Sequence, residues 1–315
     1  MEADLLRIKE RKARSKRMKK LKLDAWCWGF LSIQLIFYVF FTGWPIILSI
    51  FYSMLDWSGF TTATFVGLQN YAQLLTDRMF WNAFSNSFLY MAMVVPLQLG
   101  ISLFLAYLLN NAALRGRTLY RTAFFLPVIT TSAIIGIIMV FIWGTVGPVN
   151  HMLESLGILS QPINFLGSAD SALFTVALVA TWNTCGIFMI YWLAGLQSVP
   201  DDVYEAAKMD GASNARTFVS IVLPMIAPIG GVIAVLCIIQ ALRVFDIVIT
   251  MTGGGPFFST EVIATYVYRI AFTGVMGLPR MGYASAAALM FGAVVIVIGI
   301  VLNTIKTALQ NKGGA

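Results

Sequence analysis

Few residues of this 315-residue chain are of types that carry out chemistry. His151 is the single histidine and stands without cysteine or clustered carboxylate neighbours, so the spacings that bind zinc are absent from the sequence. Cys27, Cys185 and Cys237 lie within apolar runs and form no Cys-x-x-Cys pair, which is typical of small hydrophobic residues. We therefore predict no catalytic residue, no metal site and no disulfide.

Polar side chains inside long apolar runs are more informative. Asn183 and Thr184 stand within ATWNTCGIF, beside Trp182, and Gln240 stands within LCIIQALRVFD. Uncharged donors and acceptors next to aromatic rings suit sugar hydroxyls better than phosphate or carboxylate groups. Helical periodicity adds the residues that share a face with Gln240, which gives six candidate pathway residues: Asn183, Thr184, Cys237, Gln240, Ala241 and Val244. For Asn183 and Gln240, contact with a neighbouring helix is an equally good interpretation.

The elements that carry these residues are predicted membrane spans. Hydrophobic residues make up 59% of the chain and charged residues 11%, whereas soluble domains average about a quarter charged. Crossing a hydrocarbon core takes about 20 apolar residues in a helix. Six runs reach this length: 25–52, 88–109, 123–143, 172–196, 224–245 and 284–302. We expect an all-α, polytopic membrane protein with six transmembrane helices, because a span must satisfy its backbone hydrogen bonds internally.

Prolines and small residues predict the shape of three spans. Pro45 within the first run and Pro127 within the third predict kinks. In the third span, nearby threonine and serine hydroxyls are expected to satisfy freed carbonyls. Ala284, Ala288 and Gly292 recur every four residues in the sixth run and predict a seam for close helix packing.

The loop 53–87 is expected to contain a short amphipathic helix. Asn70 and Gln73 have the spacing of a capping box, and apolar residues follow at helical intervals as far as Phe84. This helix is either an ordinary surface helix or a docking surface for an external partner.

Basic residues predict the orientation. Ten of the 21 precede the first span, and alternation of the six spans puts 17 on the same side as the N-terminus and three on the other. Both termini are therefore predicted to be cytoplasmic, with a basic segment at 1–24, a transmembrane domain at 25–305 and a tail at 306–315. The basic run abuts a span, so we interpret it as an anchor beside the lipid bilayer rather than a nucleic-acid patch.

One cytoplasmic loop, 198–224, is acidic where this rule predicts basic residues. Ser198 is a candidate N-cap for a first helix, and Gly211 is expected to end that helix, because glycine adopts a left-handed conformation at little cost. A second short helix is expected over 213–223 or 214–223, before Pro224 opens the fifth span. Alanines at 206 and 207 leave room for close approach by another protein.

The spacing within this loop is its most specific feature. Glu-Ala-Ala at 205–207 is followed after three residues by Gly211, and after nine more by Ile-x-Leu-Pro at 221–224. This pattern resembles the EAA loop of ABC importer permeases, the family with a six-helix type I permease core. In that family the loop docks onto the ATP-hydrolysing subunit. The resemblance implies a coupling role for Glu205, Ala206, Ala207, Asp210, Gly211, Ile221, Leu223 and Pro224.

Three further stretches resemble carbohydrate-uptake permeases related to the larger membrane subunit of the maltose transporter. They are FVGLQNYAQLLTDRMFWNAFSNS, LYRTAFFLPVITTSAIIGIIMVFIW and FDIVITMTGGGPFFSTEVIATYVYRIAF. The resemblance implies a permease subunit of an ATP-driven, binding-protein-dependent sugar importer, with an oligosaccharide as cargo, in a bacterial inner membrane. The implied partners are a second permease, an ATPase dimer that binds ATP and magnesium, and an extracytoplasmic solute-binding protein. The extra spans and large outer domain of the maltose subunit are not expected here.

Two other function classes fit the sequence less well. A secondary transporter coupled to protons needs buried carboxylates, and only Asp246 lies near the edge of a span, where we expect it to pair with Arg243. A membrane enzyme needs a cluster of reactive side chains that this sequence lacks. The sequence has no Gly-x-x-x-x-Gly-Lys-Ser/Thr, so we expect no nucleotide or other cofactor on this chain, and we interpret Gly-Gly-Gly-Pro at 253–256 as a tight turn.

Overall fold

The computed structural model of the protein describes residues 18, 22–60, 62–111, 114–273 and 277–313. Helices make up most of the described chain, and its strands are limited to one short pair, which confirms the predicted all-α fold. In chain order the elements are η1 (Val39–Gly43), α2 (Trp44–Ser53), β1 (Leu55–Asp56), β2 (Thr64–Phe65), α3 (Gln69–Thr76), α4 (Arg78–Asn110), α5 (Arg117–Ile129), α6 (Ser132–Ile142), α7 (Pro148–Ser155), α8 (Ala169–Gln197), α9 (Asp201–Met209), α10 (Asn214–Thr217), η2 (Phe218–Val222), α11 (Leu223–Leu242), α12 (Asp246–Met251), α13 (Ile263–Tyr268), η3 (Arg269–Thr273) and α14 (Met281–Gly313). The η elements are π-helical turns, and β1 and β2 form one short antiparallel pair.

Five helices in the described chain are long and apolar enough to cross a membrane, and a sixth span is formed if one bent pair is counted. The five are Lys22–Ser53, Arg78–Asn110, Ala169–Gln197, Asn214–Leu242 and Met281–Val301. Each of them overlaps one of the predicted runs. The six-span prediction therefore holds, with the third span as the broken one.

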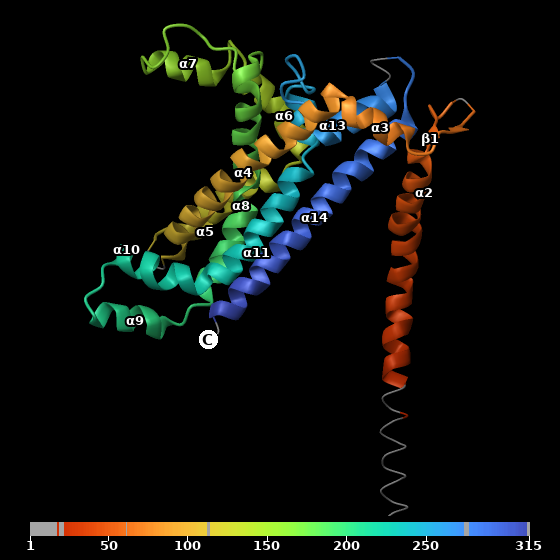
Figure 1. Ribbon diagram of the computed structural model, residues 1–315. Helices are drawn as coiled ribbons and strands as arrows, with labels where there is room; N and C mark the ends of the chain where they lie inside the picture. The colour runs from red at the N-terminus through yellow and green to blue at the C-terminus, as the bar shows by residue number, and fades with distance from the viewer. Residues whose placement is uncertain (1–17, 19–21, 61, 112–113, 274–276, 314–315) are drawn as a thin grey trace, which may run out of the picture.

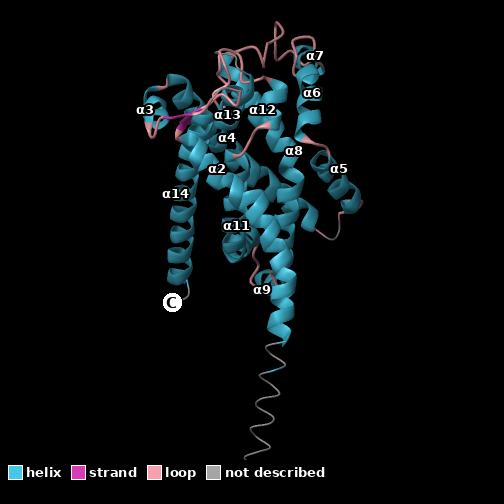
Figure 2. Ribbon diagram, turned by 90° about the vertical axis from the view of Figure 1, so that its right-hand side faces the viewer, coloured by secondary structure: helices cyan, strands magenta, loops and turns pink. Residues whose placement is uncertain are grey.

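The third span is bent far more sharply than a simple proline kink. Helices α5 and α6 meet at 99° across a break at Thr130 and Thr131, shortly after Pro127. In Figure 2, α5 and then α6 carry the chain from the turn below α5 up to α7. The pair thus follows the path of one span with two differently directed halves.

The centre of the bundle is α8. In its most apolar 18-residue stretch, 67% of the residues are buried. In the corresponding stretches of the other candidate spans at most 28% are buried. Helices α4, α5 and α11 pack around it, and Figure 1 shows α8 in the middle of the group. Gly186 on α8 permits the crossing with α5, because a Cβ there would overlap the backbone of Phe124 and Phe125. The side chains of α8 are therefore well placed to line any path between helices.

The first helix, Lys22–Ser53, stands apart from the bundle. None of its most apolar window is buried, and in Figure 1 it diverges from the other spans. It contacts the rest of the chain at one end. There the carbonyl of Tyr52 in its last turn, together with that of Leu55 in β1, lies so close to Gly282 of α14 that a Cβ would overlap it. The π-helical turn η1 lies directly before Pro45, where a proline interrupts regular helical bonding.

The small-residue seam predicted on α14 is only partly used within this chain. Ala284 is buried, but Ala288 is exposed and a Cβ at Gly292 would meet no atom within 4 Å. The close approach occurs instead at Gly282, two residues before the first residue of the predicted pattern. The helix also continues to Gly313, so the predicted tail at 306–315 is helical over its described part. The predicted basic segment at 1–24 lies almost entirely outside the described residues.

The two ends of the bundle differ in their elements. We call the end that carries α9 and α10 the elbow end, and the end that carries α3, α7, α12 and α13 the cap end (Figure 1). At the cap end, the predicted amphipathic helix is α3, but the predicted capping box is wrong. Asn70 lies inside α3, and its amide donates to the carbonyls of Ser53 and Leu55. Phe84 belongs to α4, which starts at Arg78, ten residues before the predicted span.

Candidate functional sites: a membrane pocket and a protruding elbow

The loop predicted to couple to a partner is a helix, a tight turn and a second helix. We call residues 201–217 the elbow. After α9 the amide of Gly211 donates to the carbonyl of Lys208, and the amide of Ala212 donates to that of Ala207, which is the Schellman pattern of helix ends. Gly211 has a φ of +71°, and a Cβ there would meet no atom of this chain within 4 Å. Glycine is required here by backbone conformation alone, and the predicted stop at Gly211 is correct.

Two details of the predicted elbow are wrong. Ser198 does not cap α9, because its hydroxyl donates to the carbonyl of Gly195 at the end of α8. The second helix does not end before Pro224 but continues from Asn214 to Leu242. The π-helical turn η2 precedes Pro224 and accommodates the backbone bond that proline cannot make.

The eight predicted coupling residues divide into an exposed set and a packed set. Glu205, Ala206, Asp210, Gly211 and Pro224 are exposed. Ala207 is only 3% exposed, and Ile221 and Leu223 are half-buried. The close approach that Ala207 permits is therefore internal to this chain rather than toward a partner. Only the exposed set is available to another protein.

Sequence reasoning missed one exposed residue of the elbow. Met209 is 88% exposed although it is a large apolar residue on an otherwise polar turn. Methionine is flexible and polarizable and is common at adaptable binding surfaces, so Met209 is a candidate contact residue of the elbow. Its position at the last residue of the acidic helix was the only signal in the sequence.

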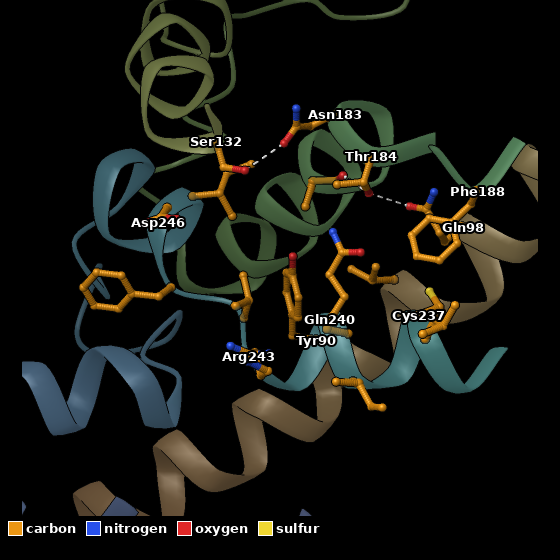
Figure 3. Close-up of a pocket in the computed structure, with 18 residues that line it drawn as sticks. Tyr90, Gln98, Ser132, Asn183, Thr184, Phe188, Cys237, Gln240, Arg243 and Asp246 are labelled. Atoms are coloured by element: carbon orange, nitrogen blue, oxygen red, sulfur yellow. Dashed lines mark hydrogen bonds between the residues drawn. The ribbon is translucent and has the colours of Figure 1, made fainter. Parts of the chain in front are cut away.

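All six predicted pathway residues line one pocket of about 370 Å³. Its walls come from α4, α6, α8, α11 and the break after α11, and Figure 3 shows Gln240 between Tyr90 and Thr184. This volume is within the range of about 300–1,000 Å³ typical of small-molecule sites. The structure thus brings the predicted residues together, whereas their contact with a substrate stays a prediction.

Asn183 holds the broken span together. Its amide nitrogen lies 2.8 Å from the carbonyl oxygen of Pro127 on α5, and its amide oxygen lies 3.0 Å from the hydroxyl of Ser132 on α6. The expected bonds from the hydroxyls just after Pro127 to carbonyls of α5 are not found among the described residues, and the Ser132 hydroxyl bonds to Asn183 instead. Of the two interpretations open for Asn183, the structure shows contact with neighbouring helices.

Gln240 differs from Asn183 because it is exposed and its side chain makes no hydrogen bond to another described residue. Its amide is therefore free to bind a molecule in the pocket.

Sequence reasoning missed Gln98 and Tyr90, which line the pocket from α4. Gln98 is fully buried, and its amide lies 3.0 Å from the Thr184 hydroxyl. The signal for Gln98 was a glutamine within the second apolar run. Trp182, in contrast, is 45% exposed and lines a different pocket beside α5 and α6.

The end of α11 corrects two predictions. The helix stops at Leu242, so Val244 does not share its face and reaches the pocket from the non-helical residues that follow. Arg243 and Asp246 both line the pocket and both are exposed, but the described chain contains no ion pair between them. The pocket therefore has neutral amides in its middle and two opposite charges at one end.

The cap end is held by hydrogen bonds to one carboxylate. Asp77 Oδ2 accepts from the hydroxyls of Tyr266 (2.6 Å) and Tyr283 (2.8 Å), and Oδ1 accepts from the backbone amides of Met79 and Phe80 at the start of α4. Burial alone would favour the neutral acid, but these four bonds to the charged form hold the pKa of Asp77 below its usual value. This carboxylate joins α4, α13 and α14.

A second charged group at the cap end is a buried ion pair. Glu261 is 2% exposed and pairs with Arg269, whose guanidinium also donates to the carbonyl of Gly253 and stacks on the ring of Phe258. Burial raises the pKa of Glu261 above its usual value, although Arg269 opposes this shift. Gly254 has a φ of +88°, and a Cβ there would overlap the side chains of Glu261 and Arg269. The predicted turn at 253–256 is therefore present, and it packs against this ion pair. We call Asp77, Glu261, Arg269, Tyr266 and Tyr283 the cap network.

The described fold, with a broken third span and an elbow between α8 and α11, agrees with a comparison of sequences. The family described as "Binding-protein-dependent transport system inner membrane component" matches residues 77–312, which include both the pocket and the elbow. The chain belongs to this family. The resemblance to ABC importer permeases drawn from 205–224 is confirmed.

Two relatives and one solved structure show the extent of the similarity. The "Probable ABC transporter permease protein YurN" of Bacillus subtilis is 34% identical, over 90% of this chain and 95% of the relative. The "Multiple sugar-binding transport system permease protein MsmF" of Streptococcus mutans is 33% identical, over 94% of this chain and 98% of the relative. A bacterial ABC transporter involved in the import of alginate contains a chain of the same fold, with a TM-score of 0.79 and 24% identity, covering 93% and 99% of the two chains. This family member is thus an inner membrane transport component and not itself an enzyme.

Proposed function

We propose that this chain is the permease subunit of an ATP-driven, binding-protein-dependent sugar importer, and that it couples to a separate ATPase through the elbow. One observation carries the proposal. The helix from Asn214 to Leu242 starts in the elbow and ends in the pocket, where Gln240 lies two residues before its last residue. Its 29 residues correspond to a length of about 43 Å. A force on the elbow therefore reaches the pocket through one continuous element.

The elbow supplies the contact surface for the partner. Glu205, Met209 and Gly211 are exposed, and no atom of this chain fills the space where a Gly211 side chain would lie. A partner ATPase that carries ATP and magnesium would bind this surface and move it during hydrolysis. Because η2 lies at the base of the elbow, its π-helical turn is the natural place for the helix to change direction.

The pocket supplies the cargo site. Its central polar groups are the uncharged side chains of Gln240, Thr184 and Tyr90, which can bind hydroxyl groups. The exposed Arg243 and Asp246 at one end can do the same, since carboxylates accept from hydroxyls and guanidinium groups donate to them. The relative from Streptococcus mutans is named for multiple sugars. We infer an oligosaccharide as cargo, because the chain resembles carbohydrate-uptake permeases and the pocket offers several hydroxyl-binding side chains.

The remaining surfaces fit the other partners. The excess of basic residues supports a cytoplasmic elbow end, so the cap end would face the solute-binding protein. The first helix, whose apolar residues are exposed along its length, would contact lipid and a second permease, which we take to be a different chain.

Reconstitution tests this proposal. The chain would be purified with its second permease, ATPase and binding protein, and placed in liposomes with radiolabelled maltose, lactose or raffinose. We expect uptake that requires ATP and stops when the ATPase or the binding protein is omitted. Replacing Gln240 with alanine should reduce uptake without preventing assembly of the subunits. Uptake by the chain alone, driven by an ion gradient, would contradict the proposal and favour a secondary transporter.

A further inference from the structure

A second pocket, of about 470 Å³, lies at the elbow end and is separate from the pathway pocket. One wall comes from the last turns of α4 and α8, which belong to the bundle, and the other comes from the elbow itself. The residues used below are Tyr107, Asn110, Leu196, Tyr204, Asn214 and Thr217. The pocket therefore spans the junction between the fixed bundle and the element that would move.

One largely buried residue of this pocket has a polar side chain without a partner in the described chain. Thr217 is 7% exposed, yet its hydroxyl makes no hydrogen bond to any described residue. Helical threonines commonly bond to a carbonyl one turn earlier, as Thr181 and Thr184 do on α8. The Thr217 hydroxyl is not among the fully buried side-chain atoms without a partner, so it is accessible from the pocket. It can therefore bond to a ligand that carries hydrogen-bonding groups.

The other lining groups define the chemistry of that ligand. The amides of Asn110 and Asn214 and the phenols of Tyr107 and Tyr204 are also without a hydrogen-bond partner in the described chain. Burial and the neighbouring Asp201 raise the pKa of Tyr204, so its hydroxyl keeps its proton. No charged side chain of the described residues lines the pocket. These groups suit an uncharged ligand with several hydroxyls and exclude an anion as the preferred one.

Aromatic rings complete the site. The rings of Tyr107 and Phe218 lie with their centroids 4.4 Å apart, and both residues line the pocket, together with the ring of Tyr204. Sugar rings present apolar C–H faces between their hydroxyls, so amphipathic aromatic rings next to amides form a suitable environment. The volume is larger than that of the pathway pocket, about 470 Å³ against 370 Å³. An uncharged saccharide matches the pocket in size, polarity and absence of charge.

We propose that this pocket binds the imported saccharide from the cytoplasmic side and slows further transport. The proposal rests on the proposed function, because that function makes the elbow a moving part and delivers sugar to this side. A saccharide here would bond Thr217 and Asn214 of the elbow and Asn110 of α4 at once, and so hold the elbow in the present arrangement. A ligand that binds one arrangement better than another shifts the population toward it. Accumulated product would thus inhibit its own import.

Hydrogen exchange on the complete importer tests the site directly. The four-component complex would be placed in nanodiscs, and amide exchange within 201–217 would be measured with maltose, lactose or raffinose, each added singly, and with glucose 6-phosphate as an anionic control. We expect at least one of the neutral sugars to slow exchange in 201–217, and glucose 6-phosphate to have no effect. The same sugar, in excess over the binding protein, should reduce ATP hydrolysis.

Two variants identify the pocket. Thr217→Val keeps the shape and removes the hydroxyl, so the sugar concentration that gives half protection should rise about two- to tenfold. Asn110→Leu lies outside the elbow, should leave uninhibited ATP hydrolysis near the wild-type rate, and should raise the inhibitory concentration similarly. Thr217→Ser should restore binding, and Gln240→Ala, in the pathway pocket, should leave the protection of 201–217 unchanged.

The outcomes separate this proposal from the proposed function. If one of the sugars is taken up but none slows exchange in 201–217, the elbow pocket is not a saccharide site, although the importer function stands. The same holds if the protection is equal in Thr217→Val, Asn110→Leu and wild type, or if glucose 6-phosphate protects as well as the neutral sugars. Protection without uptake of any sugar would support the site and contradict the importer function.

Discussion

The cap end and the elbow end of this permease are built in opposite ways. At the cap end, helices far apart in sequence are joined by charged and hydrogen-bonded groups. For example, Asp77 accepts hydrogen bonds from the hydroxyls of Tyr266 and Tyr283. At the elbow end, α9 is held by a few side chains such as Ala207, while Glu205, Met209 and Gly211 are exposed. The bundle is therefore fixed at one end, and the other end carries the surface offered to a partner.

This difference matches two different demands. Loops that meet a docking protein from outside work best as a preorganised surface, because little conformational entropy is then lost on binding. An element that transmits motion must be able to leave its own bundle without breaking a buried network. We expect substitutions at the cap end to change stability and substitutions at the elbow to change coupling.

The largest effect on stability is expected from Arg269→Met. This change leaves Glu261, which is 2% exposed, as a buried carboxylate without its cation, and losses of about 3–5 kcal/mol are typical of such cases. The folded-state pKa of Glu261 is raised already, so the deficit should be larger at neutral pH and shrink as falling pH protonates the carboxylate. Thermal unfolding in detergent at several pH values measures this effect.

Arg280 offers a matched control for that experiment. It is an exposed arginine of the cap end that donates to Gln73 and stacks on Tyr283. Arg280→Met should cost less than about 1 kcal/mol, as is typical of exposed charges. Equal losses in the two variants would show that burial of the Glu261 pair does not determine the stability of the cap end.

A smaller effect is expected from Asp77→Asn, about 1–3 kcal/mol, because the charged form accepts four hydrogen bonds. The pKa of Asp77 is lowered from a usual value of 3.8, so its contribution is present above that pH and lost as the pH falls through the lower folded-state value. Thermal unfolding should therefore show a loss below about pH 4 in the wild type that is smaller in Asp77→Asn. Asp56→Asn, at an exposed position of the same end, should behave like wild type.

Replacing either of two equivalent glycines should have a still smaller effect on stability. Gly211 in the elbow has a φ of +71° and Gly157 after α7 has a φ of +70°, both follow a helix in the same Schellman pattern, and both face open space. Leucine at either position costs about 1–2 kcal/mol of backbone strain. We expect Gly211→Leu and Gly157→Leu to lower the unfolding temperature by the same small amount. A much larger loss for Gly211→Leu would mean that the elbow is a structural rather than a coupling element.

The smallest effect on stability is expected from Met209→Ser. The side chain is 88% exposed, so its removal should change the free energy of unfolding by less than about 0.5 kcal/mol. If Met209 contacts the ATPase, the same change should weaken co-purification of the two subunits. Unchanged co-purification would remove Met209 from the partner surface.

Sequence patterns predicted most of the membrane architecture, because spans and turns depend on local properties. Apolar length found all six runs, and the stop at Gly211 followed from the left-handed conformation that glycine allows. The six predicted pathway residues line one pocket because residues at helical spacing share a face in long, regular helices such as α8 and α11.

The errors came from interactions between distant segments. Nothing near Asn70 in sequence indicates that it bonds to Ser53 and Leu55, and nothing near Asn183 indicates that it bridges the two halves of the third span. The end of α11 at Leu242 has no glycine or proline signal, so Val244 was placed on a helix that had already stopped. The role of Asp77 in the cap network was missed because its partners Tyr266 and Tyr283 lie 189 and 206 residues away in sequence.

The central claim is that the elbow transmits the work of ATP to the pathway, and the ratio of sugar imported to ATP hydrolysed tests it most directly. In liposomes with the complete importer, Gly211→Leu should lower this ratio at least about tenfold, equivalent to a coupling loss of about 1.4 kcal/mol. Gly157→Leu, with the same local strain at the opposite end, should keep the wild-type ratio. A wild-type ratio for Gly211→Leu in a normally assembled complex would contradict the account.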